Sequence, residues 1–114
     1  MTNDELNRWI AENVMGLDVA NICGDLLYCK PPTRGFTIPV PNYCGDIKAA
    51  FEVVRKMEEQ MGGCCFEFNL TKSETNVSTG WKCRFEHEEA YWDATADTAP
   101  MAICLSARKA VEDV

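Results

Sequence analysis

Several aromatic, cationic and helix-starting residues of this sequence are of the kinds that together bind a small phosphorylated ligand. Aromatic rings stack on nucleobases, Lys and Arg neutralise phosphate, and the first amides of a helix attract anions. Asp46 would accept hydrogen bonds from ribose hydroxyls or cap its helix. The candidate ligand-binding residues are Tyr43, Asp46, Lys82, Arg84, Tyr91, Trp92, Thr98 and Arg34.

Each candidate also has a purely structural interpretation. The ring of Tyr43 could cover a sheet, Trp92 could belong to the core, and Lys82 and Arg84 could form a solvated strand face. The sequence leaves both interpretations open.

No arrangement typical of a catalytic site is evident in the sequence. Its one histidine, His87, and Cys83 would be roughly 13 Å apart on a strand. Gly62-Gly63 follows a predicted helix, whereas a phosphate-binding glycine loop precedes one. We therefore expect a non-enzymatic protein with no catalytic residues and no cofactor.

The seven cysteines indicate reduced thiols. Their number is odd, and they include no Cys-x-x-Cys pair of the kind that holds zinc. The first residues are acidic and lack the apolar segment of a secretion signal. We expect small buried thiols, no metal site and an intracellular location.

Length and charge restrict the class of protein. The 114 residues fit a single domain, 1–114. The 18 acidic and 11 basic residues give a net charge of −7, whereas affinity for polynucleotides and anionic membranes depends mainly on Lys and Arg. No window reaches the roughly 18 apolar residues of a membrane span. We expect neither polymeric nucleic acid nor a membrane as a partner.

Three segments, 3–15, 45–61 and 97 or 98 to 111 or beyond, have the apolar spacing of helices. Capping residues and helix stops mark their ends. These are Thr2 with Glu5, then Gly16, for the first helix, Asn42 or Cys44, then Gly62-Gly63, for the second, and Asp97 or Thr98 with Pro100 for the third.

Two segments, 66–71 and 81–87, alternate apolar and polar residues and are predicted to form an antiparallel hairpin around a polar loop, 72–80. Facing charges would place Glu67 opposite Lys82 or Arg84. Residues 88–96 are interpreted as a second connection. Residues 19–28 form one short strand or an irregular segment with a turn at Gly24-Asp25, 30–35 a loop, and 36–41 an extended edge or docking arm.

Together these elements predict an α+β fold, an α-β-α layered sandwich with a small, mostly antiparallel sheet and three helices packed on it. The third helix is apolar almost all round, so we expect it to be buried on more than one side. We also expect a homo-oligomer, a dimer or a higher even assembly, with the 36–41 arm and the Ala102 and Ala110 surfaces as contacts.

Three blocks of sequence resemble one family. They are WIAENVMGL at 9–17, YCGDIKAAFEVV at 43–54 and ADTAPMAICLSARKAV at 96–111. In this order and spacing they resemble the small phage proteins of the phage ABA sandwich domain. The chain departs from the family pattern at Cys44-Gly45, where the pattern has Ser-Thr, at Phe51, where it has Trp, and at Arg108, where it has Leu. The resemblance implies an α-β-α layered fold and a phage or prophage origin, and little about activity.

By functional analogy, we expect a phage counter-defence protein of the host bacterial cytoplasm. It would bind a nucleotide immune signal, of the cyclic dinucleotide or cyclic ADP-ribose type, at a subunit interface and sequester it without cleavage. Replacing Lys82 and Arg84 by Ala would weaken binding more than about tenfold. The alternatives are an inhibitor that covers a basic host protein with Asp93, Asp97 and the glutamates of 86–89, and a structural or accessory domain without a ligand.

Overall fold

A computed structural model of the chain describes residues 2–23, 26–30, 38–61, 66–74 and 79–113. Within these ranges three helices and two three-stranded antiparallel sheets are present. The helices are α1 (Asn3–Asn13), α2 (Ile47–Met61) and α3 (Ala99–Glu112). The strands are β1 (Asp18–Cys23), β2 (Leu26–Lys30), β3 (Ile38–Pro39), β4 (Phe66–Glu74), β5 (Thr79–His87) and β6 (Ala90–Ala96).

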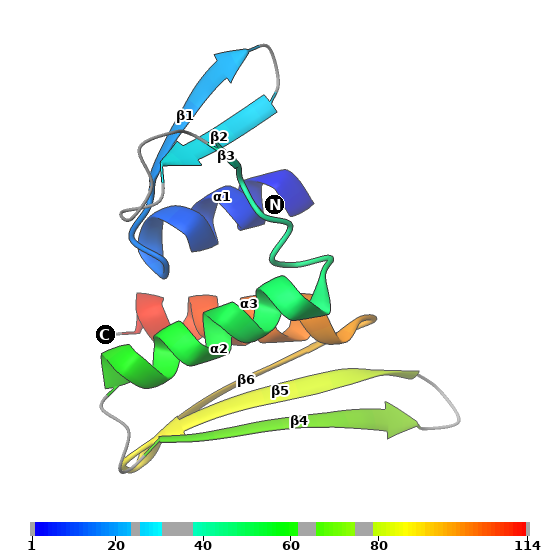
Figure 1. Cartoon of the computed structure of the whole chain (residues 1–114). Helices are drawn as coiled ribbons and strands as arrows, with labels where there is room; N and C mark the ends of the chain where they lie inside the picture. Colours follow the sequence, from blue (N-terminus) through cyan, green and yellow to red (C-terminus); the bar gives the residue numbers. More distant parts are fainter. Residues whose placement is uncertain (1, 24–25, 31–37, 62–65, 75–78, 114) are drawn as a thin grey trace.

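The elements are stacked in layers (Figure 1). Helices α2 and α3 lie on one face of the β4–β5–β6 sheet, α1 lies beyond this helix pair, and the β1–β2–β3 sheet lies beyond α1. The expected α+β class, with an antiparallel sheet and three helices, is confirmed. The expectation that all three helices pack on the hairpin sheet needs correction, because α1 packs on α3 and β1 instead.

The predicted hairpin is present as β4 and β5, but with a different register. Both strands extend into the segment expected to be a loop, to Glu74 and from Thr79. Glu67 lies opposite Glu86, whereas Arg84 lies opposite Asn69. The expected pairing of Glu67 with Lys82 or Arg84 is therefore wrong, because strand length and turn position set the register rather than exposed charges.

Strand β6 replaces the connection expected at 88–96. It pairs antiparallel with β5, so that Trp92 lies opposite Phe85 and Asp93 lies opposite Arg84. Ala94 is buried, while Tyr91 and Thr95 are exposed, as expected for a strand with one wet face. Acidic residues around a short apolar run concealed this alternation in the sequence.

The β1–β2–β3 sheet contains the N-terminal residues whose secondary structure the sequence left open. Residues 19–28 contribute two strands, β1 and β2, rather than one. Ile38 and Pro39 form the short edge strand β3, which confirms the edge interpretation of 36–41 for these two residues. The loop expected at 30–35 is wrong at Lys30, which is the last residue of β2. The turn expected at Gly24-Asp25 and the loop residues 31–35 lie outside the described residues.

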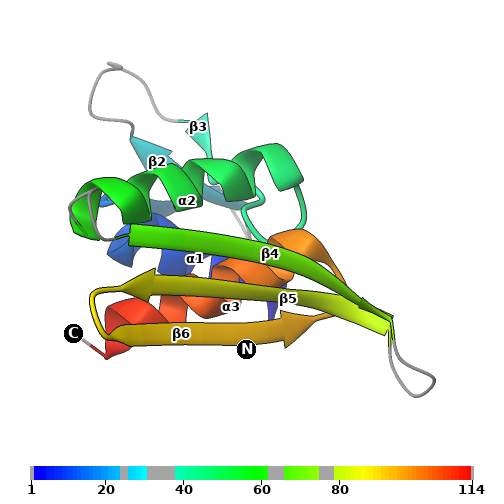
Figure 2. The same cartoon turned by 90° about the horizontal axis from the view of Figure 1, so that it is seen from below.

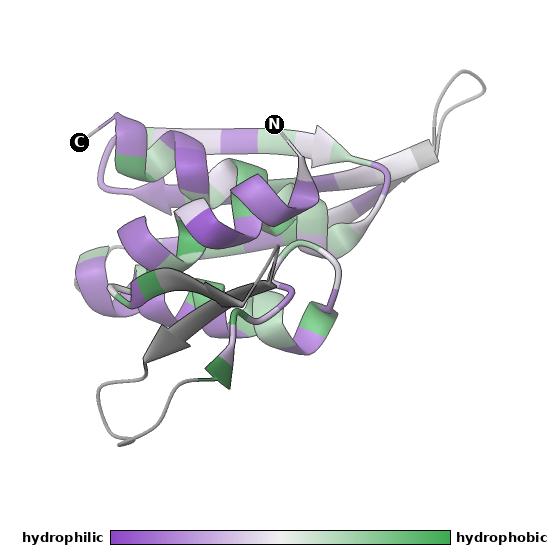
Figure 3. Cartoon of the chain, turned by 90° about the horizontal axis from the view of Figure 1, so that it is seen from above, coloured by the Kyte–Doolittle hydropathy of each residue, from purple (hydrophilic) through white to green (hydrophobic). Residues whose placement is uncertain are grey.

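The core lies between α2, α3, the first helix and the inner face of the β4–β5–β6 sheet. Figure 3 shows apolar and polar segments along each helix, as amphipathic helices require. The fully buried side chains include Ile10, Val53, Met57, Phe85, Ala102, Ile103, Ala107 and Ala110. The third helix is buried on more than one side, as expected. Ala102 and Ala110 are thus covered within the chain, and their expected role as contacts with a second copy is wrong.

Local hydrogen bonds fix the helix ends. The Thr2 hydroxyl accepts from Glu5 N at 3.2 Å, and Gly16 has a φ of 69°, so both expected ends of α1 are confirmed. Asp46 caps α2, since its Oδ1 accepts from Lys48 N at 3.0 Å. The expected caps, Asn42 and Cys44, lie just upstream. Gly62-Gly63 lies outside the described residues. No helix in the described part of the chain is long and apolar enough to span a membrane.

Candidate functional site

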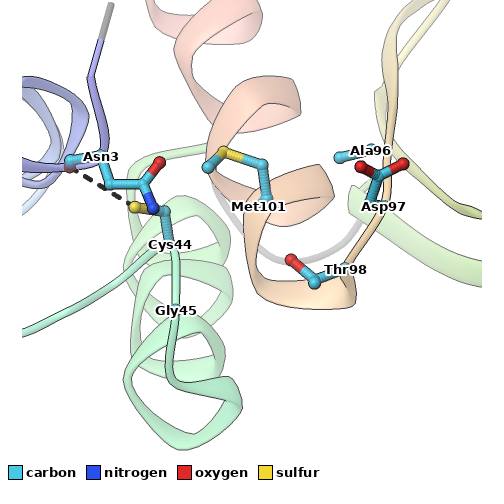
Figure 4. A pocket seen from close by; sticks show the side chains of 7 residues that line it. All are labelled: Asn3, Cys44, Gly45, Ala96, Asp97, Thr98 and Met101. Atoms are coloured by element: carbon cyan, nitrogen blue, oxygen red, sulfur yellow. Dashed lines mark hydrogen bonds between the residues drawn. The ribbon is translucent and has the colours of Figure 1, made fainter.

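The starts of α1 and α3 and the segment that leads into α2 surround one pocket of about 480 Å³. Asn3 comes from the start of α1, Cys44 and Gly45 precede α2, and Thr98 and Met101 belong to the start of α3. Figure 4 shows these side chains around a common space, with Asp97 and Ala96 at the end of β6. This volume is within the usual range of small-molecule sites, roughly 300–1,000 Å³.

The start of α3 leaves hydrogen-bond donors for a ligand. Thr98 is the N-cap, as expected, but its side chain makes no capping hydrogen bond. The first backbone hydrogen bond of the helix runs from Ala102 N to the Thr98 carbonyl. First-turn amides lack intrahelical acceptors, and the helix dipole makes this end attractive for anions. Pro100 has no N–H, so Ala99 and Met101 supply the first-turn donors after Thr98.

The wall formed before α2 is held rigidly. Cys44 N donates to the side-chain oxygen of buried Asn7 at 3.0 Å, and Asn7 Nδ2 donates to Asn42 Oδ1 at 3.0 Å. A Cβ atom at position 45 would overlap the Asn42 side chain. Glycine has no Cβ, so the backbone can lie this close to Asn42. The Cys44 thiol donates to the Asn3 carbonyl at 3.5 Å and so links the starts of α1 and α2 (Figure 4).

The electrostatics of the pocket are mixed. Asp97 is exposed, and the seven lining residues include no Lys or Arg. Burial raises the pKa of the Cys44 thiol, and the nearby Asp4 carboxylate raises it further. The thiol therefore stays protonated at neutral pH and serves as a hydrogen-bond donor rather than a nucleophile.

Lys82, Arg84 and Tyr91 come together elsewhere, on the outer face of the β4–β5–β6 sheet. Arg84 donates to Asp93 at 3.1 Å and to Glu86 at 3.3 Å. Lys82 Nζ lies 3.8 Å from the same Asp93 carboxylate. The Arg84 guanidinium is 4.4 Å from the centre of the Tyr91 ring. The hydrogen bond to Asp93 is the main reason that the pKa of Arg84 is raised.

These pairings change the role of the outer face. Residues Asn69, Thr71, Lys82, Arg84 and Glu86 line a hollow of about 250 Å³ there. Its two cations already have carboxylate partners within the sheet. An anionic ligand would have to compete with Asp93 and Glu86, so this face is a weaker phosphate site than the sequence suggested.

The remaining candidates divide between the core and the surface. Tyr43 is 1% exposed, so its ring belongs to the core and is not available to stack on a base. Asp46 caps α2. Trp92 is half-buried and donates from Nε1 to Asp113 at 2.8 Å, at the end of α3. Arg34 lies outside the described residues.

The described structure thus separates residues that the sequence suggested as one site. Thr98 lies after the last residue of β6, whereas Tyr91 and Trp92 lie near its first residue. The pocket residues that sequence reasoning missed are Asn3, Cys44, Gly45, Ala96, Asp97 and Met101. The sequence does contain a signal for one part of the pocket, because Thr98-Ala99-Pro100 is a typical helix start. It contains none for the meeting of the starts of α1 and α3 with the segment before α2.

The buried thiols belong to the core. Burial raises the pKa of Cys83 to about 12 and also raises that of Cys104. Among the described residues, no three His, Cys, Asp or Glu side chains lie close enough together to hold a metal ion. Cys83 and Cys104 therefore act as small apolar side chains.

The fold and the pocket define a small α+β domain in which one antiparallel sheet is covered by helices whose starts frame a cavity. The Phage ABA sandwich domain matches residues 8–107, and the chain belongs to this family.

One solved structure extends the similarity to nearly the whole chain. A phage protein from Bacillus cereus ATCC 14579, known from a 2.0 Å crystal structure, superimposes with a TM-score of 0.69. The two proteins are 25% identical, and the match covers 94% of this chain and 89% of the other. No match is found among curated proteins.

Proposed function

We propose that this phage protein binds a phosphorylated nucleotide in the pocket at Thr98 and sequesters it without chemical change. The observation that carries the proposal is the convergence of the starts of α1 and α3 and the segment before α2 on one pocket of about 480 Å³. In this proposal the protein acts in the host bacterial cytoplasm as a counter-defence factor, and the ligand is a cyclic dinucleotide or a cyclic ADP-ribose-type signal.

The donors at α3 support the phosphate part of the proposal. The Thr98 hydroxyl has no capping role, so it can donate to a phosphate oxygen together with the first-turn amides of Ala99 and Met101. Backbone amides and the helix dipole favour an anion even though no Lys or Arg lines the pocket.

Asp97 and Met101 support the nucleoside part. A carboxylate accepts hydrogen bonds from vicinal ribose hydroxyls, and Asp97 lies one residue before Thr98, on the pocket wall. We assign the binding of ribose hydroxyls to Asp97 rather than to Asp46, because Asp46 caps α2. The half-buried Met101 side chain is a flexible, polarisable contact surface for a base.

The experiment is titration calorimetry of the full-length protein with AMP, ADP-ribose, cyclic ADP-ribose and cyclic dinucleotides. Thr98→Val removes the hydroxyl without removing a capping bond, and we expect it to weaken binding about tenfold, or about 1.4 kcal/mol. Thr95→Val, at an exposed threonine of β6, is the matched control and should bind as the unmodified protein does.

Four outcomes would contradict the proposal. The absence of heat with every nucleotide would remove its basis. A tenfold loss in the Lys82→Ala, Arg84→Ala variant, with Thr98→Val unaffected, would move the site to the outer sheet face. Recovery of an altered nucleotide after denaturation would replace sequestration by catalysis. Capture of a basic host protein without any nucleotide binding would favour the inhibitor interpretation instead.

A further inference from the structure

The outward face of α2 carries large apolar side chains that the described structure leaves partly exposed. In the described residues, the exposed large apolar side chains are Ile47, Phe51 and Tyr91. Ile47 and Phe51 lie one turn apart on α2 and are 41% and 48% exposed. Phe51 also contacts Phe68 of β4 edge-to-face, with ring centres 6.4 Å apart, so the apolar surface continues onto the sheet. Figure 2 shows α2 along the β4 side of the molecule, away from β6.

Apart from the Asp46 cap that precedes it, α2 has no charged side chain in either end turn that complements its dipole. Its first turn has no acidic residue and its last turn has no basic residue; Lys48 lies near the start, and Glu58 lies near the end. Each of the other two helices has favourable charges in one end turn, Asp4 and Glu5 in the first turn of α1 and Lys109 in the last turn of α3.

Four charged side chains of α2 also lack a salt bridge within the described part of the chain. Arg8–Glu12 on α1 and Arg108–Glu112 on α3 each form a 2.7 Å ion pair along the helix. By contrast, four charged residues of α2 form no salt bridge with any residue in the described ranges: Lys48, Glu52, Arg55 and Glu58. Residues 48, 51, 55 and 58 follow helical spacing beside residue 47, so Ile47 and Phe51 share one exposed stripe with Lys48, Arg55 and Glu58. Glu52 lies at the edge of this stripe.

We infer that this stripe is the contact surface for a second copy of the chain, with the two α2 helices antiparallel across a twofold axis near the middle of α2. In that arrangement Lys48 of each copy approaches Glu58 of the other, and the Phe51 ring of each copy lies beside Arg55 of the other near the axis. Opposite dipoles and opposite charges then face each other, and Ile47 and Phe51 leave water.

The choice of a second copy rests on this charge complementarity, because the stripe is complementary to itself only when reversed. A pair of 15-residue helices covers less than the about 800 Å² per partner of a standard interface. The dimer is therefore concentration-dependent. This interface replaces the Ala102 and Ala110 contacts, which are buried inside the chain.

Sedimentation equilibrium of the full-length protein over a range of concentrations tests the inference. The mass should rise from 12.8 kDa towards twice that value. Phe51→Ser should raise the dissociation constant at least about tenfold. Tyr91→Ser, at a more exposed aromatic residue on β6, is the control and should leave the dissociation constant unchanged.

Charge reversal distinguishes the antiparallel arrangement from others. Lys48→Glu and Glu58→Lys should each weaken the dimer, and an equal mixture should form heterodimers in native mass spectrometry, because both contacts become attractive again. Arg8→Glu mixed with Glu12→Lys makes the same charge changes on α1 and should show no such preference.

A 12.8 kDa species at every concentration would overturn the inference. So would a dimer that Phe51→Ser leaves intact, or one that Lys48→Glu strengthens. Circular dichroism of each variant separates a loss of association from a loss of folding.

Discussion

The Asn7 side chain holds the backbone of Cys44 in place across 37 residues of sequence. Cys44 N donates to Asn7 Oδ1 at 3.0 Å, in a buried environment. The same amide group donates from Nδ2 to Asn42 at 3.0 Å. One side chain of α1 therefore fixes the segment that leads into α2, and with it one wall of the candidate pocket.

Asn7→Leu should lower the free energy of unfolding by about 2 kcal/mol. The replacement leaves the buried Cys44 N–H without its acceptor, and an unsatisfied buried donor costs about 1–3 kcal/mol. Urea unfolding followed by circular dichroism measures the change. Asn13→Leu, at an exposed residue of the same helix, is the control, and equal losses in the two variants would refute the structural role of Asn7.

Gly45→Ala should be destabilising by about 1 kcal/mol, because the new methyl group must displace the Asn42 side chain and so break its bond with Asn7. The cost should shrink in an Asn42→Ala background, where the space is vacant. A double-mutant cycle of unfolding free energies measures this coupling. Additive effects would show that Asn42 is not the obstacle.

The Cys83 thiol should make stability depend on alkaline pH. Burial raises its pKa from the ordinary 9.0 to about 12. The pKa of Cys83 is higher in the folded state than in the unfolded state. The contribution of the neutral thiol to the free energy of unfolding is therefore complete below pH 9 and is lost as pH rises from 9 towards 12. Cys83→Ala should make this decline shallower, by up to about 1.4 kcal/mol per pH unit. Urea midpoints between pH 8 and about 11 give the slopes, and parallel slopes for the two proteins would contradict the prediction.

Asp93→Ala should change the free energy of unfolding by less than about 1 kcal/mol, although Asp93 pairs with both Lys82 and Arg84. These side chains are about a third or more exposed, so water and salt screen the pairs. Ser106→Ala is the contrasting variant, since this buried hydroxyl donates to the Trp92 carbonyl at 2.7 Å. A greater loss from Asp93→Ala than from Ser106→Ala would contradict this ranking.

The helices could be predicted from sequence because their signals are local. Apolar residues at helical spacing, the Thr2–Glu5 box and Gly16 depend on neighbours within a few positions, and the structure has the helix ends within one or two residues of those expected. Strand β6 escaped prediction because Asp93 and the glutamates before it resemble a solvated turn, and only pairing with β5 makes them a wet strand face.

The candidate site could be predicted only at Thr98. A helix start can be recognised from residues 98–100, but its approach to Asn3 and Gly45 depends on how three helices pack. Tyr43 was misassigned for the same reason, because a ring beside a helix start in sequence faces the core in three dimensions. The pairing of Arg84 with Asp93 depends on strand register, which local pattern leaves undetermined.

The most direct measurement is an amide chemical-shift map of the ¹⁵N-labelled protein during titration with ADP-ribose and cyclic ADP-ribose. If the pocket holds the phosphates, the largest shifts should occur at Thr98, Ala99, Met101 and Gly45, and the ligand should be recovered unchanged. Shifts centred on Lys82 and Arg84 would contradict a nucleotide site at the start of α3. The absence of any shift at a large excess of either ligand would contradict it as well.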